Sequence, residues 1–288
     1  MQSTIKKAIE THSISSDEFH IHIEPVSKVT GLRLGELWEF RELLFFLTWR
    51  DVKVRYKQTL LGATWAILQP FLSMVVFSLF FGKLANIGSD GLPYPIFNYA
   101  ALLPWSYFSG ALSGASHSLV GSAHMITKIY FPRLILPISA GVSGLVDFCF
   151  AFLVLIGLMV FYKIQPTIYV IMLPLLLLLA MVTAIGVGLW FSAFNVRYRD
   201  VRYIVPFLVQ LWMFASPVVY SSSLLSEPWR TLYGLNPMVG VVDGFRWALL
   251  GSTPPGPMLW LSIIVAVVLF ISGLFYFRKM ETTFADEV

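Results

Sequence analysis

One acidic residue lies deep inside a long apolar stretch of this chain, and it is the first candidate for chemistry. Asp147 stands beside Phe148 and close to Phe150. A charged side chain at the middle of a bilayer costs at least about 2.5 kcal/mol, so such residues are functional candidates by default. Ion-coupled carriers usually assemble acids, histidines or basic partners on several spans. Asp147 is the one clear ionisable residue within the predicted spans, which is weak support for that mechanism. We therefore favour a hydrogen bond between helices over an ion-transport role for Asp147, and both interpretations stay open.

Other patterns that carry chemistry are absent from the sequence. His20 and His22 form an H-x-H pair in a polar segment, where a solvated stretch is favoured over a metal site. The only Gly-Lys pair, Gly82-Lys83, precedes Leu84 and lacks the upstream glycine of a phosphate-binding loop. No Ser/His/Asp or paired-carboxylate arrangement suggests catalysis, so we expect no catalytic residues, no metal and no bound cofactor. Any energy from ATP is predicted to come from another chain.

Aromatic side chains are the positive signal, because they make up 16% of the chain and many stand within apolar segments. Most could face lipid or form interfacial belts. A pore-facing ring would instead present its face to sugar C–H groups and let a long polymer slide past through weak contacts. The rings predicted to line such a path are Trp65, Phe71, Phe77, Trp105, Tyr107, Phe108, Trp212 and Tyr220.

The composition requires a membrane to position these residues. The chain has 288 residues, of which 57% are hydrophobic and 12% charged, with a mean hydropathy of +0.74. Soluble domains carry about 25% charged residues, so this chain has too few to cover a soluble globule. We predict an all-α membrane protein, since six segments approach the roughly 20 residues that a spanning helix needs. They are 63–83, 97–118, 135–161, 168–194, 203–220 and 258–277, within a transmembrane domain at 61–280.

The distribution of basic residues predicts the orientation. The N-terminal segment has no apolar signal-peptide core, and most of the 20 lysines and arginines fall on one side if it is cytoplasmic. Both polar tails, 1–35 and 281–288, are then cytoplasmic. The single cysteine, Cys149, excludes an intrachain disulfide framework and is expected to pack between helices.

A different element precedes the first span, over residues 36–60. Charged residues fall on one stripe at helical spacing, and apolar residues such as Leu44, Phe45 and Leu47 cover the opposite side. Trp38 and Trp49 stand near the boundary, as aromatic rings do at a headgroup layer. The pattern predicts an amphipathic helix that lies in the cytoplasmic interface; an ordinary helix of a soluble domain is the alternative.

Three connecting segments carry further signals. Residues 121–133 form a short helix that Pro132 ends, and their embedded apolar residues suit docking into a groove on a partner. Residues 195–202 form a compact charged turn, although membrane anchoring alone explains the charge of both segments. Residues 224–252 are too apolar for a loop in water, which favours short re-entrant helices over an extracellular loop.

Several motifs in this order resemble one known family. They are Trp49–Lys57 with Leu61–Trp65 and Gln69-Pro70, then Lys128–Arg133, Asn195–Val201, Ser216–Tyr220, Asn236–Met238 and Phe245-Arg246. Each is weak alone, whereas the ordered set over residues 36–277 is fairly specific. The chain resembles the permease subunits of type-2 ABC exporters that move polysaccharides, the family of O-antigen, capsule and teichoic-acid exporters.

The resemblance implies a homodimer in the bacterial cytoplasmic membrane, assembled with two copies of a separate ATPase subunit that binds ATP and Mg. It implies that the substrate is a lipid-linked glycan and that the other contacts are with membrane lipids, not nucleic acid. The residues implied to contact the ATPase are His124, Lys128, Tyr130, Phe131, Arg133, Arg197, Arg199 and Asp200. The residues implied to form a periplasmic gate are Trp229, Tyr233, Asn236, Pro237, Phe245 and Arg246.

Three other functions remain possible from the sequence. A type-2 ABC exporter of a lipid or a drug shares the six-span plan, and aromatic richness together with the motif set favours glycans over these. An ion-coupled carrier requires more intramembrane charges than Asp147 provides. A membrane enzyme acting on polyprenyl-linked substrates requires clustered acids or histidines at one membrane face, which the sequence lacks.

Overall fold

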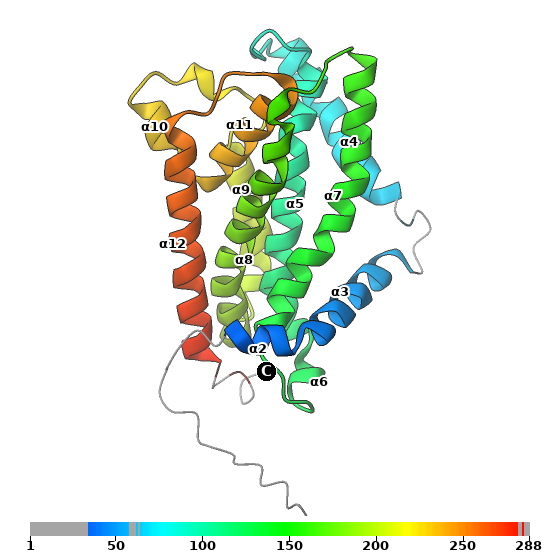
Figure 1. Ribbon diagram of the computed structural model, residues 1–288, viewed down its shortest axis with the longest axis vertical. Helices are drawn as coiled ribbons and strands as arrows, with labels where there is room; N and C mark the ends of the chain where they lie inside the picture. Colours follow the sequence, from blue (N-terminus) through cyan, green and yellow to red (C-terminus); the bar gives the residue numbers. More distant parts are fainter. Residues whose placement is uncertain (1–33, 58–61, 63, 282–283, 285–288) are drawn as a thin grey trace, which may run out of the picture. The chain divides into compact units, whose positions relative to one another are not determined.

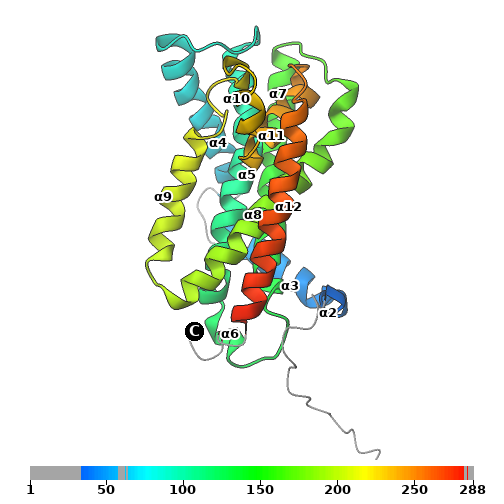
Figure 2. The ribbon, with the colours of Figure 1, turned by 90° about the vertical axis from the view of Figure 1, so that its left-hand side faces the viewer.

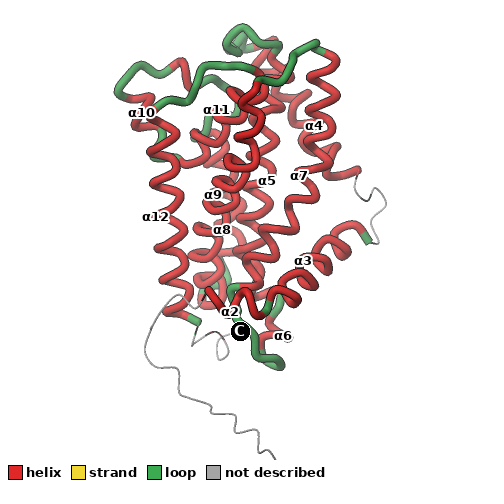
Figure 3. Tube along the Cα trace, in the orientation of Figure 1, coloured by secondary structure: helices red, strands yellow, loops and turns green. Residues whose placement is uncertain are grey.

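Every regular element in the part of the chain that the structure describes is a helix. The computed structural model describes residues 34–57, 62, 64–281 and 284, all of which belong to the compact unit Leu32–Val288. No strand occurs within these ranges (Figures 1 and 3). The α-helices are α2 (Leu34–Glu39), α3 (Arg41–Tyr56), α4 (Thr64–Phe77), α5 (Tyr94–Gly121), α6 (Ala123–Ile126), α7 (Ile135–Phe161), α8 (Leu173–Arg197), α9 (Val201–Phe214), α10 (Trp229–Tyr233), α11 (Pro237–Leu250) and α12 (Pro257–Met280). A π-helix, Ser78–Leu84, extends α4, and 3-10 turns cover Ile168–Met172 and Ser222–Leu224.

Helix α5 is the centre of the bundle. It packs against α4, α7, α8, α9 and α11, and most of its side chains are buried. Its position explains its composition: the expected span at 97–118 is rich in serine, glycine and alanine because it faces protein on most sides and lipid on few. Figure 2 shows α9 at the left margin of the bundle and α12 along the face that is turned to the viewer.

Glycines set the closest helix crossings. A Cβ on Gly188 of α8 would lie 2.6 Å from the Cβ of Ala115 on α5. A Cβ on Gly273 of α12 would overlap the backbone carbonyl of Gly186 on α8. Hydrophobic attraction between helices is weak in lipid, so membrane helices associate mainly through close packing. Small residues allow that packing because they let the two backbones approach each other.

Four helices are long and apolar enough to cross a membrane: Thr64–Leu84, Ile135–Phe161, Ile168–Arg197 and Pro257–Met280. The predicted span at 97–118 is a helix of 28 residues, α5, but it is not among these four. The predicted span at 203–220 corresponds to α9, which has 14 residues and ends at Phe214, so a helix that crosses the membrane there remains a prediction. The chain after Phe214 is non-helical up to Ser222, and three of its carbonyls accept hydrogen bonds from the buried Arg246.

Helix α3 runs obliquely along α7, and its place in the cytoplasmic interface remains a prediction. Its middle packs on α7 through Leu47, which is 1% exposed, near the end of the bundle that carries α2 and α6. Its last turn contacts Asp147, halfway along α7, so α3 is inclined along the bundle (Figure 1). Phe45 is 72% exposed, and Trp38 and Trp49 are 73% and 50% exposed.

Candidate functional site

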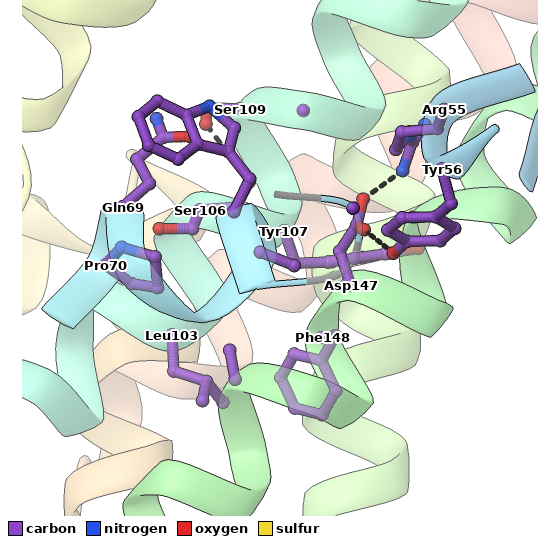
Figure 4. A pocket seen from close by; sticks show the side chains of 16 residues that line it. Arg55, Tyr56, Gln69, Pro70, Leu103, Ser106, Tyr107, Ser109, Asp147 and Phe148 are labelled. Carbon is purple, nitrogen blue, oxygen red and sulfur yellow. Dashed lines mark hydrogen bonds and ion pairs between the residues drawn. The ribbon is translucent and has the colours of Figure 1, made fainter. Parts of the chain in front are cut away.

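A cavity of about 650 Å³ lies where four helices meet. The last turn of α3, the first turns of α4, the middle of α5 and the middle of α7 line it (Figure 4). Its volume falls within the range of roughly 300–1,000 Å³ that is usual for small-ligand sites. The lining residues are Arg55, Tyr56, Gly62, Trp65, Ala66, Gln69, Pro70, Leu103, Ser106, Tyr107, Ser109, Gly110, Gly144, Asp147, Phe148 and Ala151.

The polar end of the cavity is an ion pair between α3 and α7. Asp147 accepts hydrogen bonds from the Arg55 guanidinium and from the Tyr56 hydroxyl (Figure 4). A second Arg55 nitrogen donates to Ser143 Oγ at 3.3 Å, and Ser139 Oγ donates to Asp51 at 3.4 Å. The favoured role of Asp147, a hydrogen-bond partner between helices, is therefore confirmed. Its partners on α3 were not predicted, because nothing in the sequence indicates that α3 reaches the middle of α7.

The opposite wall of the cavity is a polar stripe on α5. Ser106, Ser109 and Gly110 recur at helical spacing and are the accessible positions in the middle of an otherwise buried helix. Ser109 Oγ donates to the Ser106 carbonyl at 3.1 Å. The Ser106 hydroxyl and the Gln69 side chain of α4 have no hydrogen-bond partner within the described part of the chain. Polar groups at this depth need a partner, because lipid cannot supply one.

Aromatic rings complete the cavity. Trp65 and Tyr107, both predicted to line a path, line it together with Phe148. The prediction is corrected for Trp105 and Phe108, which are 4% and 0% exposed and belong to the core. They point to the side of α5 that other helices cover, opposite its polar stripe.

The other predicted path residues lie elsewhere. Phe71 is partly exposed on α4, and Phe77 packs against Phe81 with ring centroids 5.7 Å apart. Trp212 donates from Nε1 to Asn236 Oδ1 at 2.8 Å, and the Tyr220 and Tyr233 hydroxyls share a hydrogen bond of 2.6 Å. A path role for these side chains remains a prediction.

The segment that joins α5 to α7, here called the α6 segment, contains both exposed residues and residues that anchor it to the bundle. Tyr130 is 88% exposed, and Lys128 and His124 are also exposed. Phe131 is 5% exposed and packs into a core cluster with Leu119 and Leu47, so its expected contact with a partner is corrected.

Two further contacts define the same end of the bundle. Arg133 donates from its backbone N–H to Glu281 at 3.2 Å and from its guanidinium to the Glu281 carbonyl, which ties the α6 segment to the end of α12. Arg197, Arg199 and Asp200 are exposed on the turn between α8 and α9. Cys149 is a free thiol exposed on α7, not packed between helices as expected.

A buried arginine organises the predicted gate segment at the opposite end. Arg246 of α11 donates to the carbonyls of Phe97, Pro217, Val218 and Tyr220 at 2.6–3.2 Å. These bonds satisfy backbone groups that no helix satisfies, as an apolar environment requires.

An acidic residue that was not among the predicted site residues lies beside Arg246. Asp243 lies one helical turn before Arg246, 3.7 Å from its guanidinium, and accepts a hydrogen bond from Ser222. Its i, i+3 spacing with Arg246 was the available signal, since such pairs share a helix face.

The remaining predicted gate residues include some that are buried or cap a helix and others that are exposed. Asn236 caps α11 by accepting from Met238 N at 3.1 Å, and Pro237 occupies the first helical position, which needs no amide hydrogen. Phe245 is fully buried, so it anchors α11. Trp229 is 66% exposed on α10, and Tyr233 is partly buried.

The apolar helices, the polar groups halfway along them and the exposed aromatic margins define a multi-pass membrane protein. The sequence pattern of the ABC-2 type transporter family matches residues 42–250, and the chain belongs to this family.

Three relatives cover most of the chain. It is 32% identical over 259 residues to the O-antigen export system permease protein RfbA of Myxococcus xanthus, covering 88% of this chain and 98% of the relative. It is 25% identical over 254 residues to RfbA of Klebsiella pneumoniae, covering 88% and 96%. It is 25% identical over 239 residues to the polysialic acid transport protein KpsM of Escherichia coli, covering 81% and 91%. The chain therefore aligns with these permeases along nearly their whole length.

Proposed function

We propose that this chain is the channel-forming permease subunit of an ATP-driven exporter that moves a lipid-linked polysaccharide across the bacterial inner membrane. The observation that carries the proposal is the alignment with RfbA of Myxococcus xanthus over 98% of that protein. A relative of a different name, KpsM, is also described by the transport of a polysaccharide. Transport of a polysaccharide is common to these names, and the proposed substrate of this chain is an O-antigen-like, capsular or teichoic-acid-like glycan.

The proposed topology has six spans with both termini in the cytoplasm. Four helices meet the length and composition of a span, and α5 adds a fifth crossing of 28 residues. Helix α9 makes the sixth together with the non-helical segment that Arg246 holds. Basic residues gather at the α6 end, in Lys128, Arg197 and Arg278, as expected of a cytoplasmic face. Helices α10 and α11 then re-enter from the periplasmic side.

The proposed partners are a second copy of this chain and two copies of a cytoplasmic ATPase subunit, which binds ATP and Mg. The α6 segment supports the docking of an ATPase, because Ile129 and Tyr130 are 61% and 88% exposed while Phe131 and Arg133 fix the segment to the bundle. An exposed apolar pair on an anchored loop suits a groove on a partner.

The test is export in living cells. The chain, expressed together with the ATPase encoded beside it, is expected to restore surface glycan to a source strain from which its gene is deleted. A catalytically dead ATPase is expected to abolish the restored export. Export that persists without an active ATPase would exclude the ABC mechanism and favour an ion-coupled carrier. A complemented strain that exports a lipid or drug, but no glycan, would retain the family and reject the substrate.

A further inference from the structure

We propose that the cavity between α3, α4, α5 and α7 is a saccharide subsite, which holds sugar units of the exported glycan within a single protomer. The inference rests on the proposed function and deepens it by giving the glycan a binding place inside the chain. The residues that line this pocket in the structure all belong to one chain.

The depth of the cavity is the first reason to expect a polar occupant. Asp147 stands 12 residues after the first residue of α7 and 14 before the last, so the cavity lies halfway along this helix. A wall that faced lipid at this depth would be apolar. The accessible middle of α5 is instead Ser106, Ser109 and Gly110, and the α4 side contributes Gln69.

The unused hydrogen-bonding groups indicate what this occupant offers. The Gln69 amide can donate and accept, and the Ser106 hydroxyl can do both; neither has a partner in the described part of the chain. Asp147 still has lone pairs beyond those that Arg55 and Tyr56 use. A ligand that satisfies all three must both donate and accept, which hydroxyl groups do and phosphate oxygens do not.

The charge of the cavity supports the same class of ligand. The charges of Arg55 and Asp147 cancel, and no other charged residue among those that the structure describes lines the cavity. A diphosphate would need surplus cations, since its oxygens are strong acceptors of charge-assisted hydrogen bonds. A neutral sugar needs none. Trp65, which is 55% exposed, supplies a ring surface for its C–H groups.

The direct test is protection of a thiol placed in the cavity. Ser106→Cys is introduced in a Cys149→Ser background, because Cys149 is the only native cysteine and is exposed. The complete transporter in nanodiscs is labelled with a maleimide. The glycan released from its lipid, taken from the source strain, is expected to slow the labelling several-fold, and inorganic pyrophosphate is expected to have no effect. Ser226→Cys, exposed in the loop before α10 and outside the cavity, is the control that neither probe protects.

The second test changes the wall. Replacing Gln69 by Ala in the Ser106→Cys protein removes one polar contact worth about 1 kcal/mol, so half-protection is expected to need roughly fivefold more glycan. Trp65→Leu is expected to slow export in cells. Trp260→Leu, a matched control, replaces a tryptophan that is 70% exposed on α12 and lies outside the cavity, and is expected to leave export unchanged.

The outcomes separate the subsite from the function. Equal protection by pyrophosphate, or none by glycan while the same protein restores export, overturns the subsite and leaves the proposed function intact. Failure of the wild-type chain to restore glycan export overturns the proposed function, and the subsite with it. Size-exclusion profiles identify any wall variant that does not fold. If a wall variant does not fold, the protection of Ser106→Cys by glycan decides whether the subsite exists.

Discussion

The guanidinium carbon of Arg246 lies 3.5 Å from the ring centroid of Phe97, so an arginine of α11 stacks on the first buried turn of α5. The same guanidinium donates to carbonyls of the non-helical segment at Pro217–Tyr220. One side chain thus joins three elements that are far apart in the sequence. The arrangement uses the planar fork of arginine, which lysine lacks.

Replacing Arg246 by lysine is therefore expected to destabilise the protein although the charge is kept. Carbonyls of the 217–220 segment lose their donors, and the free energy of unfolding is expected to fall by about 3 kcal/mol. Thermal unfolding in nanodiscs measures the change. Arg230→Lys is the matched control, since the Arg230 guanidinium only reaches Thr253 at 3.5 Å. Equal melting temperatures for the two variants would contradict the role of the fork.

The Arg55–Asp147 pair predicts a non-additive double variant. Arg55→Met leaves Asp147 without its cation, and Asp147→Asn leaves Arg55 without its anion, so each is expected to loosen α3 from α7. The double variant is expected to be more stable than the sum of the single effects predicts, by about 0.5–1 kcal/mol, because both groups are partly exposed. A thermal-stability cycle of the four proteins measures the coupling; strict additivity would show that the pair contributes nothing.

Neighbouring residues on the α6 segment predict opposite defects. Tyr130→Ala removes an 88% exposed ring, so it is expected to weaken association with the ATPase while the melting temperature of the permease stays unchanged. Phe131→Ala removes a 5% exposed ring from a core cluster and is expected to cost about 3–5 kcal/mol of stability. Co-purification and thermal unfolding are measured on both. Undiminished ATPase binding by Tyr130→Ala would remove this segment from the docking surface.

Two glycine substitutions test the crossing of α8 and α12. Gly273→Ala places a Cβ against the Gly186 carbonyl, and forcing the helices apart is expected to cost about 1–3 kcal/mol. Gly157→Ala on α7 meets nothing within 4 Å and is expected to be neutral or stabilising by up to about 1 kcal/mol, because alanine favours a helix. A melting temperature of Gly273→Ala at or above that of Gly157→Ala would contradict the close crossing.

The sequence by itself determined the class of the protein. Hydropathy and charge distribution locate the helices at 135–161 and 257–280, because a bilayer accepts only long apolar segments whose backbone bonds are satisfied within the helix. The Asn-Pro start of α11 and the left-handed Gly251 at its end follow from local backbone chemistry. The ordered motifs were sufficient to predict the family that residues 42–250 match.

Only the tertiary structure decided which side chains meet. Asp147 pairs with Arg55, 92 residues away, because α3 is inclined along α7. The periodicity of a sequence does not predict the direction of one helix relative to its neighbour. Phe131 and Tyr130 have the same aromatic character in the sequence, yet packing buries one and exposes the other. The cavity depends on the relative placement of four helices, and that placement comes from non-local contacts such as Gly144 of α7 against the Tyr107 ring of α5.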